Sequence, residues 1–242
     1  QEQAAVDLKQ GPAAPHTFIG KLTSLLSVRF TAGAAPITLL SLDNCSHNGD
    51  VVRASVTEMA RRWAEQGLVS DGFLSYLEDK VPCPWTMIDK ITPRPSEAIQ
   101  KLLEKDGLED MGIIRNSHGG FFAPFVNAEK TQYLVVEDRF SNGRPPLEEA
   151  GVIFTNRETV EKVERMKVCT CLNPLHTALA VYGCLLGYTL IADEMKDPEL
   201  SKLVARIGEE GMKVVTDPGV LSPQEFLQQC LSVRFPNPAI TD

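Results

Sequence analysis

The sequence predicts an α/β part followed by an all-α part, with the change near residues 155–157. Short apolar runs of strand length occur at 36–42, 131–138 and 152–154. A polar cluster follows the first run, which is where ligands bind in open α/β sheets. After residue 155 the strand signals stop, and apolar residues recur at helical spacing as far as about 233. We therefore expect an α/β domain over residues 1–157 and the start of a helical domain over residues 158–242.

The N-terminal third predicts one helix–strand–helix succession. Residues 1–16 are polar and end in a Gly- and Pro-containing run, which favours a loop or frayed arm. Residues 17–33 carry apolar side chains at helical spacing. The run Pro36–Leu42 fits a buried parallel strand. Asp50 then stands where it can cap a helix over residues 51–66.

The remaining elements follow from the same patterns. A short helix is expected at 72–80, and a surface helix at 95–106 with Ser96 as its cap. The strands at 131–138 and 152–154 should join Ile37–Leu42 in one parallel sheet. The helical part should contain helices at 158–172, 174–192, 197–211 and 223–233, with the apolar stretch Ala178–Ala192 as a buried core helix.

Composition excludes several classes of function. The chain has 24 Lys and Arg against 32 Asp and Glu, so its net charge of −8 disfavours binding to nucleic acid. No apolar run reaches the roughly 18–20 residues that a membrane helix needs, so we expect no membrane partner. Six cysteines without a CxxC pair predict a cytoplasmic protein with no zinc site.

Three polar clusters interrupt these apolar patterns. The first is residues 41–50, which could equally be a turn in which Asn and Asp serve as caps. The second is Asp89 within the apolar run 87–91, where a salt bridge or a turn before Pro93 is the alternative. The third spans 167–176 and could be either a site or a hydrogen-bonded core network, since buried polar groups need partners.

Taken together, four stretches resemble the mannitol dehydrogenase family of polyol-specific long-chain dehydrogenases. These stretches are SLDNCSHNGD, MIDKITPRP, YLVVEDRFSNGRPPLEEAGVIFT and MKVCTCLNPLHTALAVYGCLLGY. Within that family the chain looks most like the D-mannonate oxidoreductases, also called fructuronate reductases. The resemblance implies a Rossmann-like cofactor domain, a helical substrate domain and metal-independent, NAD(H)-linked interconversion of a ketone and an alcohol.

The resemblance also implies roles for residues of the third cluster. Lys167 corresponds to a general base, Asn173 to an amide donor, and His176 to a histidine that orients the substrate. Hydride transfer to a ketone builds negative charge on its oxygen, which amide N–H donors can stabilise. A desolvated lysine can then exchange a proton with that oxygen, because burial disfavours the charged ammonium.

The first two clusters supply the other implied roles. Asn48 corresponds to a second amide donor, and Asp89 to a ligand of a substrate hydroxyl. Asn44 lies where the nicotinamide end of the cofactor should approach. The expected partner is a small sugar acid or polyol.

The third cluster departs from the family pattern in one respect. Lys167 precedes Asn173 by six residues, one more than in the family, whereas Asn173 and His176 keep a spacing of three. On an ideal helix Lys167 would therefore point away from both of them. A π-bulge would restore the arrangement, so we expect one between Lys167 and Asn173. Alternatively, Asn173 caps a new helix with Pro174 at its first position.

Enzymes of this family begin with a Gly-rich turn that binds the pyrophosphate of the cofactor. The sequence contains no such GxGxxG turn. We therefore expect an internal fragment of a chain about twice as long. Reduction of tagaturonate and oxidation of mannitol or another polyol are alternatives within the same class. A non-catalytic structural or interaction module is the alternative from a different class.

Overall fold

The computed structural model describes residues 2–130 and 132–239 of the 242-residue chain. These residues form two compact units, each of which draws on two stretches of sequence. The first unit combines Gln1–Ile88 with Leu134–Glu164, and the second combines Asp89–Tyr133 with Arg165–Asp242.

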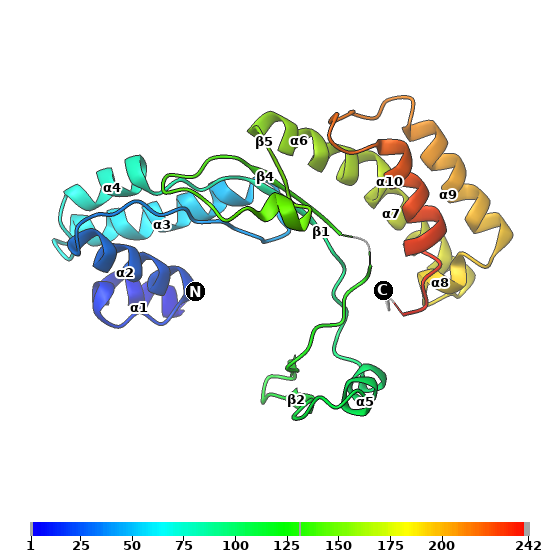
Figure 1. Ribbon diagram of the computed structural model, residues 1–242, viewed down its shortest axis with the longest axis horizontal. Helices are drawn as coiled ribbons and strands as arrows, with labels where there is room; N and C mark the ends of the chain where they lie inside the picture. The colour runs from blue at the N-terminus through cyan, green and yellow to red at the C-terminus, as the bar shows by residue number, and fades with distance from the viewer. Residues whose placement is uncertain (1, 131, 240–242) are drawn as a thin grey trace. The chain divides into compact units, whose positions relative to one another are not determined.

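Four helices pack together in the first unit (Figure 1). They are α1 (Glu2–Gln10), α2 (Phe18–Thr31), α3 (Asn48–Glu65) and α4 (Gly72–Lys80). Their core is formed by apolar side chains that alternate at helical spacing, namely Leu26, Val56, Ala60, Phe73, Tyr76, Leu77 and Val81. A 3₁₀ turn at Gly11–Ala13 joins α1 to α2.

The expectation that residues 1–16 form a loop or frayed arm is wrong, because residues 2–10 form α1. The buried carboxylate of Asp7 explains this order. It accepts hydrogen bonds from His16 N at 2.7 Å, and from Thr17 N and Oγ1 at 2.8 and 2.5 Å. Trp63 Nε1 donates to Asp7 O at 2.9 Å. These bonds tie α1 to both α2 and α3, and a polar pattern alone does not reveal them.

A three-stranded sheet has the order β1–β4–β5, with β1 at Thr86–Asp89, β4 at Tyr133–Glu137 and β5 at Ile153–Thr155. Strands β4 and β5 are parallel, with Val135 opposite Ile153. The two expected strands in this region are therefore confirmed, apart from position 131, which lies outside the described residues. A 3₁₀ turn at Leu147–Ala150 precedes β5.

The expected strand Ile37–Leu42 is not present. This segment is extended, and it donates two hydrogen bonds to a neighbouring segment, from Ile37 N to Lys80 O at 3.1 Å and from Leu39 N to Pro82 O at 3.0 Å. Pro82 and Pro84 have no N–H to return such bonds. The segment therefore runs like a strand without completing a ladder.

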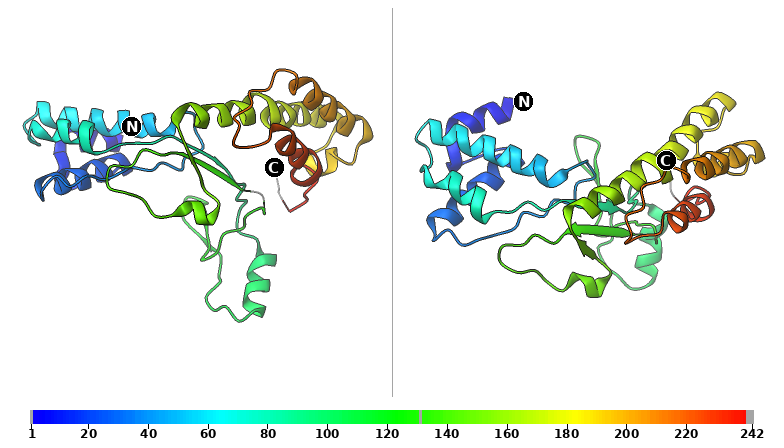
Figure 2. Two further views of the ribbon diagram at one scale, coloured as in Figure 1. Left: turned by 45° about the horizontal axis from the view of Figure 1, so that its top comes forward. Right: turned by 90° about the horizontal axis from the view of Figure 1, so that it is seen from above.

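The helical stretch of the sequence forms as expected, with breaks that the pattern did not show. Helix α6 (Arg157–Arg165) continues into a π-helix (Met166–Cys171) and then α7 (Asn173–Leu186). Helices α8 (Ile191–Glu194), α9 (Pro198–Gly211) and α10 (Pro223–Gln229) follow, and α10 runs into a second π-helix (Cys230–Arg234). Figure 2 shows α9 beside α7. Among the described residues after 165 there is no strand.

Residues 93–130 carry α5 (Glu97–Lys105) and an antiparallel hairpin of β2 (Ile114–Arg115) and β3 (Phe121–Phe122). The expected cap of α5 is confirmed, since Ser96 Oγ accepts a hydrogen bond from Ala98 N at 3.2 Å.

Helix α7 is not the buried core helix that its composition suggests. Its second half exposes a row of large apolar side chains, of which Leu185 is 77% exposed and Leu186 62%. By length and composition alone, the helical run Arg157–Leu186 could cross a membrane, since an 18-residue window within it has a mean hydropathy of 1.3. One such run is weak evidence, because core helices of soluble proteins share these properties. The absence of a membrane partner therefore stays a prediction.

Candidate active site

The loop after the extended segment 36–42 leads directly into α3. Helix α3 begins at Asn48 rather than after Asp50, so the expected cap is wrong. His47 precedes the helix in the left-handed conformation, with φ at 52°, and its ring stacks on Trp85 with centroids 3.9 Å apart. Asp50 lies in the first turn, 3.6 Å from the guanidinium of Arg157.

The side chain of Asn48 holds this loop in place. It is buried, and its Nδ2 donates to Asp43 O at 2.9 Å and to Thr86 Oγ1 at 2.7 Å. Its Oδ1 accepts from Thr86 N at 3.0 Å. An amide has two N–H donors, and the protein itself supplies acceptors for both. Asn44, in contrast, lies on the exposed part of the loop.

Gly49 allows α3 to approach the segment before β1. A Cβ at this position would lie 2.5 Å from both Cys83 O and Pro84 O. Any residue larger than glycine is therefore excluded at position 49 unless the backbone moves.

The second unit contains a buried group of four charged side chains around Asp89. Lys167 Nζ lies 3.3 Å from Asp89 Oδ1. Arg234 forms a two-pronged contact with the same carboxylate, at 2.7 Å to Oδ2 and 3.0 Å to Oδ1. Its other edge contacts Glu129 at 2.9 and 3.1 Å. All four residues are at most 8% exposed, so two carboxylates and two cations neutralise one another away from water.

The π-helix that the spacing of the third cluster predicts is present. Leu172 N donates to Lys167 O at 3.0 Å, which is the i to i+5 bond of a π turn. The extra residue is absorbed in this wider turn, and Lys167 lies buried beside Asp89. The alternative, in which Asn173 caps a new helix, is wrong, because Leu172 is the N-cap of α7 and Asn173 and Pro174 are its first two residues.

Asn173 and His176 lie on the first turn of α7. Asn173 is exposed and His176 is half-buried. The ring centroid of His176 lies 6.2 Å from that of Phe235, which directly follows Arg234. His176 also interacts electrostatically with Glu194, whose carboxylate is buried. Burial raises the pKa of Glu194, and the nearby charge of His176 offsets part of that rise.

Comparison with known proteins gives the family. The model of the mannitol dehydrogenase Rossmann domain matches residues 2–149, and the model of the mannitol dehydrogenase C-terminal domain matches residues 159–242. The chain belongs to the mannitol dehydrogenase family. Its fold is accordingly a Rossmann-like N-terminal part followed by the helical C-terminal domain of that family.

Curated relatives of this family are much longer than the chain. A D-mannonate oxidoreductase of Thermotoga maritima is 57% identical over 99% of the chain and 45% of its own length. A mannitol dehydrogenase of Saccharomyces cerevisiae is 32% identical over 96% of the chain and 42% of its own length. The chain thus spans less than half the length of either relative.

Two solved structures of polyol dehydrogenases have the same fold as the chain. The structure of a D-sorbitol dehydrogenase in substrate-free form matches the chain with a TM-score of 0.82 and 29% identity. The match covers 100% of this chain and 46% of the D-sorbitol dehydrogenase chain. The structure of a Pseudomonas fluorescens mannitol 2-dehydrogenase in ternary complex with NAD and D-mannitol matches the chain with a TM-score of 0.76 and 29% identity. The match covers 99% of this chain and 44% of the mannitol 2-dehydrogenase chain.

Of the six predicted site residues, the structure brings two into contact, Lys167 and Asp89. Asn173 and His176 follow on the adjoining helix, whereas Asn44 and Asn48 belong to the first unit. Sequence reasoning missed Arg234, Glu129 and Glu194. An available signal was the apolar surrounding of Asp89, because a carboxylate buried there requires a cation.

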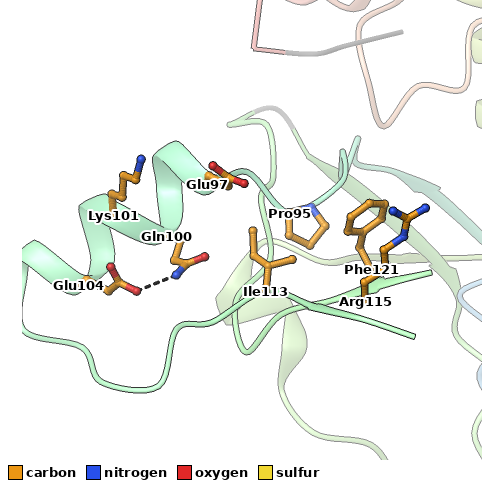
Figure 3. A pocket seen from close by; sticks show the side chains of 8 residues that line it. All are labelled: Pro95, Glu97, Gln100, Lys101, Glu104, Ile113, Arg115 and Phe121. Carbon is orange, nitrogen blue, oxygen red and sulfur yellow. Dashed lines mark hydrogen bonds between the residues drawn. The ribbon is translucent and has the colours of Figure 1, made fainter. Parts of the chain in front are cut away.

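A separate hollow lies between α5 and the β2–β3 hairpin (Figure 3). It measures about 430 Å³, and within it Gln100 Nε2 donates to Glu104 Oε1 at 2.8 Å. Its lining contains no predicted site residue and consists of Pro95, Glu97, Gln100, Lys101, Glu104, Ile113, Arg115 and Phe121. It therefore adds nothing to the site around Asp89.

Proposed function

We propose that this chain is the part of an NAD(H)-dependent oxidoreductase that carries its proton-transfer group, and that the substrate pair is D-fructuronate and D-mannonate. The observation that carries the proposal is the buried Lys167 beside Asp89, on a π-helix that adjoins Asn173 and His176. The 57% identity to a protein named D-mannonate oxidoreductase supports this choice of substrate over others.

In the proposed reaction, hydride adds to the carbonyl carbon of the substrate. The carbonyl oxygen gains negative charge as a result. In this proposal the amide of Asn173, which is exposed, donates a hydrogen bond to that oxygen. Lys167 then gives its proton to the oxygen, and in the reverse direction takes it back. His176 orients the substrate from the same turn of α7.

Asp89 accepts three contacts in the group of charges, two from Arg234 and one from Lys167. A carboxylate offers about four acceptor positions, so the contacts among the described residues leave one for a substrate hydroxyl. This remaining capacity is compatible with the role proposed for Asp89 as a substrate ligand.

The proposed cofactor is NAD(H), which supplies or accepts the hydride when it is bound, and Asn44 is the residue proposed to lie near its nicotinamide end. Asn44 projects from an exposed loop at the end of an extended segment, where α/β folds bind such groups. No GxGxxG occurs among the 242 residues, so no residue is proposed for the pyrophosphate.

Asn48 remains a proposed second amide donor, and this role would require it to release one hydrogen bond to Asp43 or Thr86. Asn48→Ala and Asn44→Ala distinguish the two functions of the loop. If Asn48 only holds the loop, its variant lowers Tm while Asn44→Ala lowers cofactor affinity alone. If Asn48 also acts in the reaction, kcat falls by more than the folded fraction of the variant explains.

The test of the proposal is reduction of D-fructuronate, D-tagaturonate and D-fructose with NADH by a protein that contains this chain. We expect the highest kcat/KM with D-fructuronate. A preference for tagaturonate or a polyol would move the substrate within the same class. Failure with all three, together with unchanged NADH fluorescence on mixing, would favour the non-catalytic interaction module.

The proposed location is the cytoplasm. All six cysteines are free thiols, which fits a reducing compartment. Fractionation of cells that express the tagged protein tests this location, and recovery with the membrane or outside the cell would contradict it.

A further inference from the structure

Arg234 occupies a distinctive position in the structure. It ends the second π-helix, it is 4% exposed, and it lies 145 residues along the chain from the Asp89 carboxylate that it contacts. The first π-helix brings Lys167 to the same carboxylate. Two irregular turns of helix therefore place two cations on one buried anion.

Glu129 completes this arrangement and fixes it to the backbone. Its Oε1 accepts a hydrogen bond from Ile91 N at 2.7 Å, and its own N donates to Ile91 O at 3.1 Å. Lys90 Nζ donates to Glu129 O. The segment that carries Asp89 is thus attached to the segment that carries Glu129, and Arg234 spans both carboxylates.

The charges of this group bear directly on proton release from Lys167. Arginine stays charged at every accessible pH. With Arg234 present, the four side chains sum to zero when Lys167 is protonated and to −1 when it is not. Without Arg234 these sums are −1 and −2, so a negative surrounding would hold the ammonium proton more tightly.

We propose that Arg234 and Glu129 are positioning residues that hold Asp89 against Lys167 and set the pH at which Lys167 exchanges its proton. This inference rests on the proposed role of Lys167. It adds two residues with opposite effects, since the cation of Arg234 favours proton release and the anion of Glu129 opposes it.

Other titratable groups lie near this cluster among the described residues. Burial raises the pKa of Cys171 to about 11 and that of Cys230 to about 12. Burial also raises the pKa of Tyr133, so these three groups stay protonated near neutral pH. Lys90 is a further cation beside Glu129. His176 and Glu194 interact with each other on the neighbouring helices α7 and α8.

The test measures the protonation of Lys167 in the chain itself, without activity. Competitive labelling of amines with acetic anhydride over a range of pH, read by mass spectrometry, gives a midpoint for each lysine. Lys162 serves as internal reference, because it lies on α6 with a 42% exposed side chain. The variants are Arg234→Gln and Glu129→Gln, with Arg206→Gln and Glu209→Gln as matched surface controls on α9.

We expect the labelling midpoint of Lys167 to rise by about one pH unit in Arg234→Gln and to fall by about one in Glu129→Gln. Lys162 and both control variants should not change. Arg234→Lys should restore the labelling midpoint of Lys167, because it restores the positive charge. It should not restore kcat in a protein that contains this chain, because an ammonium cannot make the two-pronged contact with Asp89.

Equal midpoints in all variants, or shifts in the same direction for Arg234→Gln and Glu129→Gln, would overturn the proposal. If Arg234→Gln does not fold, the direction of the Glu129→Gln shift decides. Failure of the proposed function would be distinguishable from failure of this inference. In that case the unmodified protein would not turn over the proposed substrates, while the labelling midpoints of the variants would still shift.

Discussion

Single residues determine how closely backbone segments approach at the start of α3. Gly49 packs on the carbonyl oxygens of Cys83 and Pro84, and a Cβ there would lie 2.5 Å from each. We expect Gly49→Ala to lower the free energy of unfolding by about 1–3 kcal/mol, because a packed site must open to admit the methyl group. Denaturant unfolding measures this change.

Gly112→Ala is the matched control for Gly49→Ala, since nothing lies within 4 Å of a Cβ at that position. The control should be as stable as the unmodified protein. Equal stability of both alanine variants would show that α3 can move away from residues 83–84 at no cost.

Glu194 gives the structure a dependence on pH with a definite sign. Its carboxylate is buried, and Oε2 has no hydrogen-bond partner among residues 2–130 and 132–239. Because burial raises its pKa in the folded state, its contribution to stability is full below the unfolded pKa of about 4.3 and is lost as pH rises through the folded pKa.

We therefore expect Glu194→Gln to raise Tm at about pH 8 and to leave it nearly unchanged at about pH 4, where the native carboxyl is also neutral. Thermal unfolding of both proteins across this range measures the difference. A difference in Tm that is constant with pH, or negative at the higher pH, would contradict the burial of an ionised Glu194.

Residue identity predicted one half of the charged group and not the other. Asp89 was recognisable because a carboxylate stands within an apolar run, and Lys167 because it precedes an apolar helical stretch. Arg234 and Glu129 stand in ordinary local surroundings. Their function depends on contacts across 145 and 105 residues of chain, which local patterns do not contain.

At the scale of elements, the spacing of Lys167 and Asn173 predicted the first π-helix, because one residue too many must be absorbed somewhere. The second π-helix, at Cys230–Arg234, left no such signal. The strand expected at Ile37–Leu42 failed for a reason outside the segment, namely the two prolines opposite it.

Helix α7 carries the largest departure from its expected burial. Val181, Tyr182, Leu185 and Leu186 are each at least 50% exposed. Exposed apolar surface of this kind favours association. We expect the chain alone to self-associate or bind a hydrophobic dye, and Leu185→Glu with Leu186→Gln to reduce both without lowering Tm.

Light scattering and dye fluorescence of the paired variant measure this effect. Lys202→Gln, on α9, provides a surface control that leaves the apolar row intact. If the paired variant unfolds while the control does not, the two leucines support the structure of α7 and are not simply exposed.

At the scale of the whole chain, the succession from α/β to helical could be predicted, because the periodicity of apolar residues changes near residue 155. The two compact units could not, because residues 89–133 fold with the helices while residues 134–164 fold with the N-terminal part. The chain crosses between the units several times, and such crossings depend on contacts far apart in sequence.

The central claim is that Lys167, held by Asp89, exchanges the proton of the substrate oxygen. Its most direct test is kcat for Lys167→Ala in a protein that contains this chain, with Lys162→Ala as control because Lys162 pairs with Glu158 at the surface. We predict that kcat falls by about 10²–10⁴ in Lys167→Ala, with NADH affinity unchanged and the control fully active. A Lys167→Ala variant that keeps more than about a tenth of the original kcat would contradict the account.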